Sequence, residues 1–370
     1  MSDLARGTPV LAPIRLFDLE APATAVAPTH LRAWQAGAGV AFLLAAATAG
    51  LVVGPAGLSP GAVIEEIVGH ALPFLHLHSG LSATGRVVVW QLRLPRIVLG
   101  MLVGAMLAVA GASYQGVFSN PLADPYLLGV ASGAGLGATL ALVYAGDLSQ
   151  LWIDPVPVAA FLGATVAVVA TLVLGRSRRS SSAPAPLLLA GIAVGAMLNA
   201  VQTFLQQRSA PDLQAVYSWI LGGLATAGWS QVLLVLPYVG ASMLALVSCR
   251  RLLDVLSVGD DESTAVGVRA ARVRLVVIIA ATLGTAAAVS VSGLIGFVGI
   301  IVPHGIRLVA GPSYRRIVPL SVLVGAGFLV LADLLAREVL SPAELPLGVV
   351  TAFIGAPFFL VVLRRARRTA

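Results

Sequence analysis

The sequence predicts an all-α polytopic membrane protein with ten membrane-spanning helices and both termini in the cytoplasm. Its 370 residues are 58% hydrophobic and only 11% charged, and the mean hydropathy is +0.95. A soluble domain carries about 25% charged residues, so this chain has too little charge to cover a water-facing surface. Two further observations support the prediction: a series of uncharged runs long enough to cross a bilayer, and a one-sided distribution of arginine.

Eight uncharged runs approach the roughly 20 residues that a spanning helix needs. They are Trp34–Gly54, Ile97–Ala123, Pro125–Gly146, Pro155–Gly175, Leu187–Gln207, Trp229–Cys249, Ile317–Ala332 and Leu345–Leu363. A further run, Leu275–Ile306, is uncharged over 32 residues. One helix of that length would reach about 48 Å across a core of about 30 Å, so two passes that turn near Ser290–Gly293 are predicted. The spacing of Gly293, Gly296 and Gly299 by three predicts one helix face there.

The arginine distribution favours ten spans over nine. The chain has 23 basic residues, all of them arginine. With the N-terminus inside, ten spans place 18 arginines on the inner side and 5 on the outer side, whereas nine spans give 12 and 11. Basic residues accumulate on the cytoplasmic side of membrane proteins. The five outer arginines are then Arg86, Arg93, Arg96, Arg208 and Arg337.

The chain divides into a tail and one helical domain. Residues 1–33 mix Pro, Ala, Thr and scattered charges, which predicts a flexible cytoplasmic tail, and residues 34–365 hold the ten spans. Two connections are long. Residues 55–90 lie outside, where they have room for a surface helix, and residues 250–274 form a densely charged inner loop.

Missing residue types exclude several chemistries. Without lysine there is no phosphate-binding loop of the Gly-Lys-Ser/Thr type and no Schiff-base lysine, so any ATP must be bound by another chain. Cys249, the single cysteine, rules out an internal disulfide and a multi-cysteine metal site; it is interpreted as a small apolar residue in a span. We therefore expect no catalysis, no cofactor, no resident metal and no nucleic-acid partner.

Histidines give a weak signal. His70, His76 and His78 lie in the outer loop, where such a cluster is able to contact haem or a metal. A solvated loop with three histidines is the preferred interpretation. His304 follows Pro303 at the inner end of a span and is interpreted as a packed or interface histidine.

Charges within the predicted spans are scarce. Asp333 lies near the outer end of the ninth span, and Asp124 in a short inner turn. An ion-coupled carrier is expected to hold acidic groups near the bilayer midplane. The scarcity argues against an ion-coupled secondary transporter, which stays the alternative function, with an intramembrane enzyme as a more distant third.

Five segments carry a family resemblance. They are Gln91–Gly137 with its Arg-Leu-Pro-Arg and Asn-Pro-Leu-Ala-Asp-Pro, Tyr217–Gly223, Gly293–Gly311, Leu331–Arg337 and Ala343–Phe359. In this order and spacing the chain resembles the iron-siderophore, haem and cobalamin permease family of bacterial ATP-binding-cassette importers. The resemblance runs from about residue 34 to 365 and leaves the tail outside.

The resemblance implies a fold, a function and partners. It implies a ten-helix permease in the bacterial cytoplasmic (inner) membrane that works as a homodimer, with the translocation path along the dimer axis. Two ATPase subunits would bind the inner face, and a soluble substrate-binding protein would deliver a metal chelate to the outer face. Alternating access would then move a ferric siderophore, haem or cobalamin. An iron chelate is preferred because that class is broad.

The resemblance also implies a docking role for Arg93, Arg96 and Arg337. These match outer-face arginines that pair with glutamates of the binding protein, and the predicted topology independently places them outside. The arginine fork holds a carboxylate with two hydrogen bonds and stays charged. The alternative is that Arg93 and Arg96 anchor a helix end at the lipid headgroups.

Two inner segments match as well. The coupling segment that contacts the ATPase comprises Gly259, Asp260, Asp261, Glu262, Ser263, Val266 and Gly267. Ser263 stands at the family's usual alanine and Val266 at its usual leucine, and the acidic run suits a helix N-terminus; the alternative is a solvated turn. The cytoplasmic gate corresponds to Ala183, Pro184, Ala185 and Pro186, where the family often has polar residues.

Overall fold

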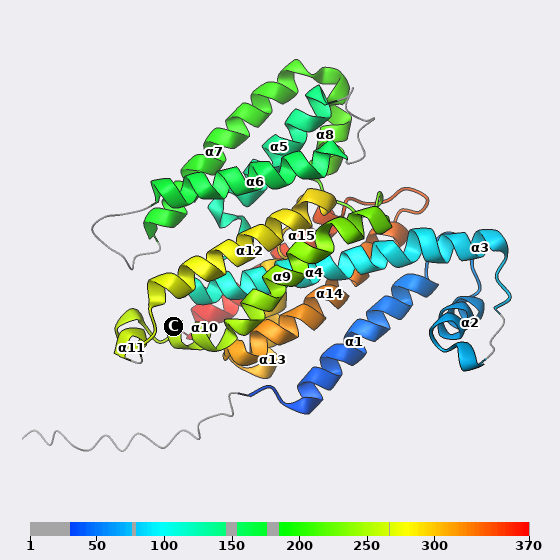
Figure 1. Ribbon diagram of the computed structural model, residues 1–370, viewed down its shortest axis with the longest axis horizontal. Coiled ribbons are helices and arrows are strands. Elements are labelled where there is room, and N and C mark those ends of the chain that lie inside the picture. Colours follow the sequence, from blue (N-terminus) through cyan, green and yellow to red (C-terminus); the bar gives the residue numbers. More distant parts are fainter. Residues whose placement is uncertain (1–29, 76–78, 146–153, 176–184, 266, 370) are drawn as a thin grey trace, which may run out of the picture.

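The computed structural model describes residues 30–75, 79–145, 154–175, 185–265 and 267–369. Most of the predicted tail therefore lies outside the described residues. The described ranges form helices and contain no strand. Figure 1 shows the long helices running side by side along the molecule. The longer helices are α1 (Ala33–Val52), α2 (Pro60–Ala71), α4 (Leu94–Val117), α5 (Val130–Tyr144), α6 (Pro155–Leu174), α7 (Ala185–Arg208), α9 (Trp229–Ser248), α12 (Ala270–Ser292), α13 (Val298–Ala310), α14 (Tyr314–Glu338) and α15 (Leu347–Thr369).

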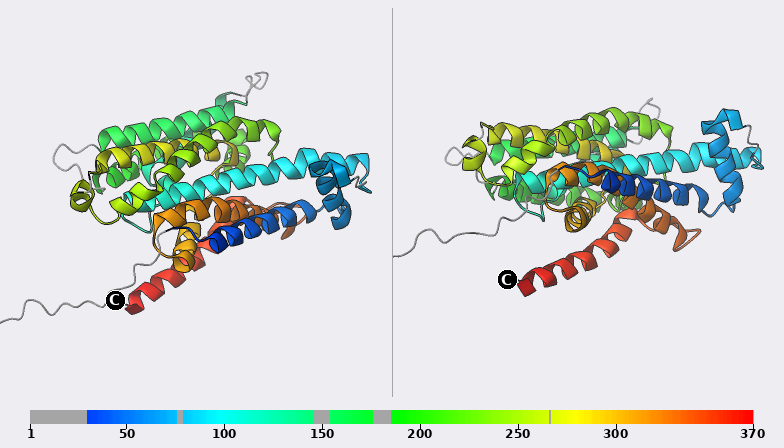
Figure 2. Two further views of the ribbon diagram at one scale, coloured as in Figure 1. Left: turned by 60° about the horizontal axis from the view of Figure 1, so that its bottom comes forward. Right: turned by 90° about the horizontal axis from the view of Figure 1, so that it is seen from below.

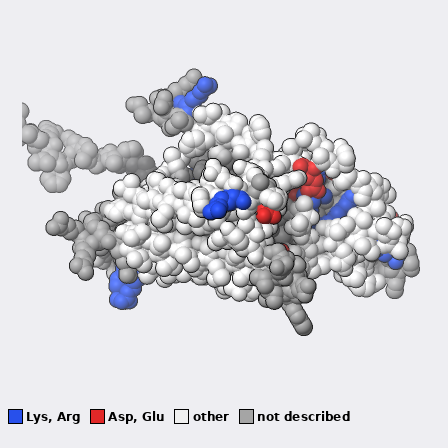
Figure 3. Space-filling view, turned by 90° about the horizontal axis from the view of Figure 1, so that it is seen from above, with Lys and Arg blue, Asp and Glu red and all other residues white. Residues whose placement is uncertain are grey.

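Seven helical stretches among the described residues are long and apolar enough to cross a membrane. They are Ala33–Val52, Ala83–Val117, Pro155–Leu174, Pro186–Arg208, Trp229–Ser248, Ala270–Ser292 and Tyr314–Glu338. Three shorter helical stretches are also apolar: Val130–Tyr144, Val298–Ala310 and Leu347–Val362. Large apolar side chains point outward from these helices, such as Leu162, Val166 and Val173 of α6, and the face in Figure 3 is almost entirely uncharged. An apolar exterior of this kind suits lipid, and the protein is a polytopic membrane protein.

The predicted division of the 32-residue run is confirmed, but the predicted glycine face is wrong. α12 ends at Ser292 and α13 begins at Val298. Gly293 has a φ of +66° and ends α12, and Gly296 lies in the connection, so of the three glycines Gly299 alone lies in α13. A Cβ on Gly293 would overlap the carbonyl oxygen of Trp219, because the end of α8 (Leu213–Ile220) passes directly over this turn.

Helix α4 lies at the centre of the fold, and nearly all of its residues are buried. Glycines permit its closest crossings. A Cβ on Gly104 would overlap the Gly325 carbonyl of α14, and one on Gly111 would overlap the Gly299 carbonyl of α13. Helices that cross at glycine approach until their backbones touch, which is the usual way for membrane helices to associate. α4 therefore fixes α13 and α14 in place.

The two ends of the bundle differ in character. Figures 1 and 2 show the short helices α10 (Arg250–Leu256) and α11 (Asp260–Ala265) at one end, and α2 with α3 (Ala83–Val87) at the other. The start of α1 and the end of α15 lie toward the α10–α11 end (Figure 2). The surface helix predicted within residues 55–90 is α2, whose Glu66 accepts a hydrogen bond from Trp90 Nε1 at 3.1 Å and pairs with Arg86 at 3.4 Å.

Candidate functional site

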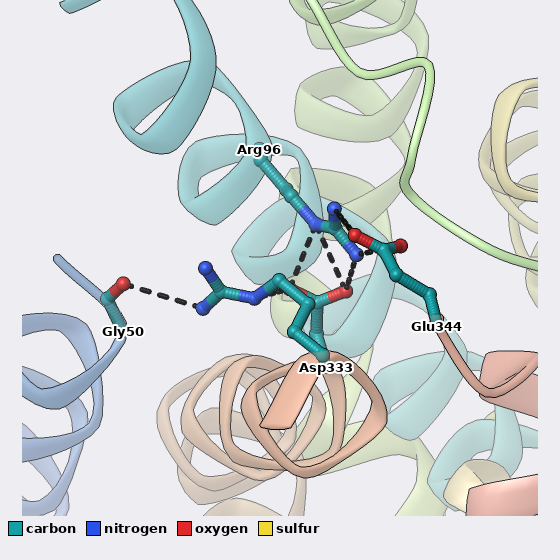
Figure 4. Close-up of polar contacts among 5 residues, drawn as sticks. Gly50, Arg96, Asp333 and Glu344 are labelled. Carbon is teal, nitrogen blue, oxygen red and sulfur yellow. Dashed lines mark hydrogen bonds and ion pairs between the residues drawn. The ribbon is translucent and has the colours of Figure 1, made fainter. Parts of the chain in front are cut away.

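An arginine–carboxylate cluster lies where α4, α14 and the connection to α15 meet (Figure 4). α4 begins at the end of the bundle where α2 and α3 lie (Figure 1). Arg96 donates from Nε to both oxygens of Asp333, at 3.1 and 3.0 Å, and from Nη2 to Oδ1 at 2.8 Å. Asp333 also pairs with Nε of Arg337 at 3.2 Å, one helical turn further along α14. We call Arg93, Arg96, Arg337, Asp333 and Glu344 the arginine cluster.

Arg93 and Arg337 bind the end of α1 and do not form an exposed clamp. Arg93 is 5% exposed, and its Nη1 donates to the carbonyls of Leu51 at 2.6 Å and Val52 at 3.1 Å. Arg337 is 6% exposed and donates from Nη2 to the Gly50 carbonyl at 3.3 Å. The last carbonyls of a helix lack intrahelical partners and carry partial negative charge. The structure thus brings the three predicted arginines together, with two of them buried in the chain's own packing.

Glu344 belongs to the cluster although the sequence interpretation left it out. Its oxygens accept from Arg96 Nη1 at 2.8 Å and Nη2 at 2.9 Å, so this arginine holds two carboxylates at once. The Glu344 side chain is 39% exposed and that of Arg96 is 12% exposed. The hydrogen bond from Arg96 lowers the pKa of Glu344. The sequence signal that would have identified Glu344 is an acidic residue two positions before Pro346, at the start of the last span.

The predicted coupling segment forms the short helix α11 and the turn after it. α11 begins at Asp260, where the acidic run begins; of the predicted residues, Val266 lies outside those described. Ser263 is buried and donates to the carbonyls of Val255 at 3.1 Å and Gly259 at 2.5 Å, which joins α11 to α10. Gly267 is exposed with a φ of +80° and has open space around it.

Asp254 connects α10 to the first turn of α14. Its carboxylate accepts from the backbone N–H of Tyr314 at 2.5 Å and from Ser313 Oγ at 2.8 Å, and it pairs with Arg315 Nε at 3.3 Å. A carboxylate at a helix N-terminus satisfies free N–H groups and complements the helix dipole. α14 is therefore held at its first turn by α10 and near its last turn by the arginine cluster.

The predicted gate is only partly described. Ala183 and Pro184 lie outside the described residues, Ala185 begins α7, and Pro186 is partly buried in its first turn. Its chemistry stays a prediction.

Two adjoining grooves run across α7, α8 and α15, and the sequence interpretation missed both. One, of about 280 Å³, is lined by Asn199, Gln202, Thr203 and Gln206 of α7 with Tyr217 of α8. These α7 residues follow the helical spacing of three and four that marks one face, a signal present in the sequence. The second groove, of about 590 Å³, is lined by apolar residues that include Phe297 and Phe353. Both grooves share Ile220 and Leu294.

Two of the described histidines, His70 and His304, pack against aromatic rings. His70 lies 4.5 Å from the Trp90 ring, and His304 lies 5.6 Å edge-on from the Phe358 ring. His76 and His78 lie outside the described residues. Among the described residues, no three His, Cys, Asp or Glu side chains form a group suited to a metal ion.

Comparison with known proteins assigns the class. The profile of the FecCD transport family matches residues 42–365, and a solved metal-chelate type ABC transporter in an inward-facing conformation has the same fold. That structure gives a TM-score of 0.75 at 29% identity and covers 89% of this chain and 98% of its own. The chain belongs to the FecCD transport family.

Relatives within the family carry different substrate names. The chain is 41% identical over 288 residues to the cobalamin import system permease protein BtuC of Halobacterium salinarum, which covers 78% of this chain and 76% of that protein. It is 35% identical over 314 residues to the Fe(3+)-citrate import system permease protein YfmE of Bacillus subtilis, with 84% and 89% covered. Both relatives are importer permeases.

Proposed function

We propose that this chain is the permease subunit of an ATP-driven importer that carries a metal chelate across the bacterial cytoplasmic membrane. The observation that carries the proposal is the family match over residues 42–365, together with the match to a metal-chelate type transporter along 98% of its chain. The seven long and three shorter apolar stretches supply the ten predicted spans. ATP hydrolysis belongs to two partner ATPase subunits, and the working permease is a homodimer.

The inner end of the molecule, with α10 and α11, is the ATPase-contacting end in this proposal. The 25 residues of α14 give a rod about 37 Å long, which is enough to cross the bilayer core. Asp254 holds one end of this rod and Asp333 belongs to the other. A displacement of α10 by an ATPase would therefore be transmitted along α14 to the outer surface.

The outer end is the binding-protein end. Arg96 is the member of the predicted docking triad whose fork reaches the surface, through its contact with the exposed Glu344. Arg93 and Arg337 support docking by fixing the last turn of α1 beside it. Charge-assisted, two-pronged hydrogen bonds are the expected mode of recognition for a carboxylate on the binding protein.

The two grooves form the wall of the translocation path in the homodimer. Polar residues on one face of a membrane helix line water or a partner, and the α7 face offers amide and hydroxyl groups. Neither groove is lined by a charged residue. This wall favours a bulky neutral chelate with its own amides, such as cobalamin, over a polyanionic one such as ferric citrate. No residue of the sequence favours an iron chelate over cobalamin.

A competition experiment tests the substrate assignment. The substrate-binding protein of the same system is titrated with cobalamin, ferric hydroxamate, haem and ferric citrate. Uptake is then measured with the permease in proteoliposomes. Cobalamin is expected to bind and to be taken up, and Gln206→Leu together with Thr203→Val should slow its uptake while leaving binding-protein docking unchanged. Selective uptake of ferric citrate would contradict the assignment.

The alternative of an ion-coupled carrier lacks a suitable carboxylate. Within the described spanning helices, Asp333 is the one acidic residue that is buried, and it is already paired with Arg96 and Arg337. Asp124, whose pKa is raised by burial, lies in the connection between α4 and α5 and not within a span. A carboxylate neutralised by two arginines is a poor proton or sodium carrier, because ionisation is fixed by its partners.

A further inference from the structure

We propose that Glu344 is an internal substitute for the binding protein's carboxylate: it occupies the outer edge of the Arg96 fork in the undocked permease and is displaced when the binding protein docks. The inference rests on the proposed docking function and adds the group that competes with the partner. It makes docking an exchange of one ion pair for another rather than the filling of a free cationic site.

The donors of Arg96 are divided between two carboxylates. Nε faces Asp333 alone, Nη1 faces Glu344 at 2.8 Å, and Nη2 serves both at 2.8 and 2.9 Å. An arginine fork takes one carboxylate along its Nε–Nη2 edge and another along its Nη1–Nη2 edge. Because both edges are filled, an arriving carboxylate has no free pair of donors on Arg96 and must replace one of the two.

Of the two carboxylates bound to Arg96, Glu344 is the one that an arriving carboxylate can displace. Asp333 is 4% exposed and also pairs with Arg337, so its removal would take the carboxylate partner from the buried Arg337, which is costly. The Glu344 side chain is 39% exposed and has Arg96 as its ion-pair partner. It is therefore able to turn into water, where an ionised carboxylate is well solvated.

The backbone around Glu344 allows this exchange without unfolding. The next residue, Leu345, donates its N–H to the Ala336 carbonyl at 2.9 Å, and Ala343 donates to the Leu340 carbonyl at 3.0 Å. These bonds hold the connection between α14 and α15 from both sides of Glu344. The side chain can rotate away while its backbone stays in place, so replacing the carboxylate should leave the fold intact.

The test measures the affinity of the binding protein for the permease. The permease is assembled with its ATPase subunits in lipid nanodiscs and titrated with the substrate-binding protein of the same system. Glu344→Gln should bind about two- to five-fold more tightly at low salt, the range expected when one exposed ion pair no longer has to be broken. Glu344→Asp, which keeps the charge on a shorter side chain, should give a smaller gain. The matched control is Glu65→Gln, which removes an exposed charge from α2 at the same end.

Salt dependence supplies a second readout that a purely structural role would not change. In the unaltered permease one ion pair is lost as another forms, so binding should weaken only moderately between about 0.1 M and 1 M salt, as the Debye length falls from about 10 to 3 Å. In Glu344→Gln a pair forms without a loss, and the salt dependence should be steeper.

The variant Arg96→Ala distinguishes the proposed docking at Arg96 from the proposed displacement of Glu344. If it weakens binding while Glu344→Gln leaves affinity and salt dependence unchanged, docking at Arg96 stands and the exchange is wrong. If Arg96→Ala leaves binding unchanged, the docking assignment itself fails, and the exchange with it. Equal tightening by Glu65→Gln would reduce the effect to net charge and would also overturn the exchange.

Discussion

Individual arginines in this protein have different roles although the sequence pattern groups them. Arg93 and Arg337 close the last turn of α1 from inside the fold, whereas Arg96 faces the surface through Glu344. Counting arginines along the chain predicts the side of the membrane on which each arginine lies, because the side follows from the span boundaries. It did not predict burial, because the direction of a long side chain depends on which helix ends lie beside it.

Replacing Arg93 should therefore reduce stability more than it changes docking chemistry. Arg93→Ala removes two hydrogen bonds to carbonyls at the end of α1, and hydrogen bonds to charged groups contribute about 1.5–3 kcal/mol each. We expect a clear fall in the apparent melting temperature in detergent. Arg208→Ala is the control, because Arg208 is exposed at the end of α7. Equal melting temperatures for Arg93→Ala and the unaltered chain would contradict the assigned contacts.

Because of the carboxyl group of Asp124, we expect the stability of the folded protein to depend on pH. Burial raises its pKa from 3.8 to about 6, so the folded state holds its proton more tightly than the unfolded state. Stability from this group is present below about pH 4 and lost as the pH rises to about 6. Asp124→Asn, which can still accept from the Tyr126 N–H, should raise stability at pH 8 by about 1–3 kcal/mol and have little effect at pH 4. Melting curves at the two pH values check this, and a gain confined to low pH would refute it.

At the level of elements, hydropathy along the sequence predicted where the helices lie but not which residues share one face of a helix. The split between α12 and α13 followed from length alone, since one straight helix would be too long for the bilayer. The supposed glycine face failed because glycine spacing does not distinguish a helix from a turn with positive φ. The polar face of α7 was overlooked because a mean hydropathy over a span averages away four polar residues on one side.

The turn after α11 is the element where energy coupling is tested. Gly267 has a φ of +80°, which a β-branched residue adopts only with strain. Gly267→Val should distort the coupling segment, so that ATP hydrolysis by the assembled complex continues while chelate uptake falls several-fold. Gly57→Val is the matched control, since Gly57 has a φ of +58° in open space at the opposite end. Unimpaired uptake by Gly267→Val would remove this turn from the coupling pathway.

On the scale of the whole molecule, the orientation of the bundle in the membrane determines which end faces the cytoplasm and which faces the outside. In the proposed ten-span arrangement, both termini and the α10–α11 end lie in the cytoplasm, and the arginine cluster lies outside. Cysteines introduced by Ser2→Cys and Thr369→Cys in a Cys249→Ala background should resist impermeant thiol reagents in intact cells and react after permeabilisation. Labelling of position 369 from outside would contradict the ten-span arrangement.

The source of energy is the central claim, and a reconstituted uptake assay tests it most directly. The permease is placed in proteoliposomes with and without its ATPase subunits, with the binding protein and labelled cobalamin outside and ATP inside. We predict accumulation only when ATPase subunits, ATP and binding protein are all present, no effect of proton or sodium ionophores, and no ATP hydrolysis by the permease alone. Accumulation driven by a proton or sodium gradient in vesicles without the ATPase would contradict the account.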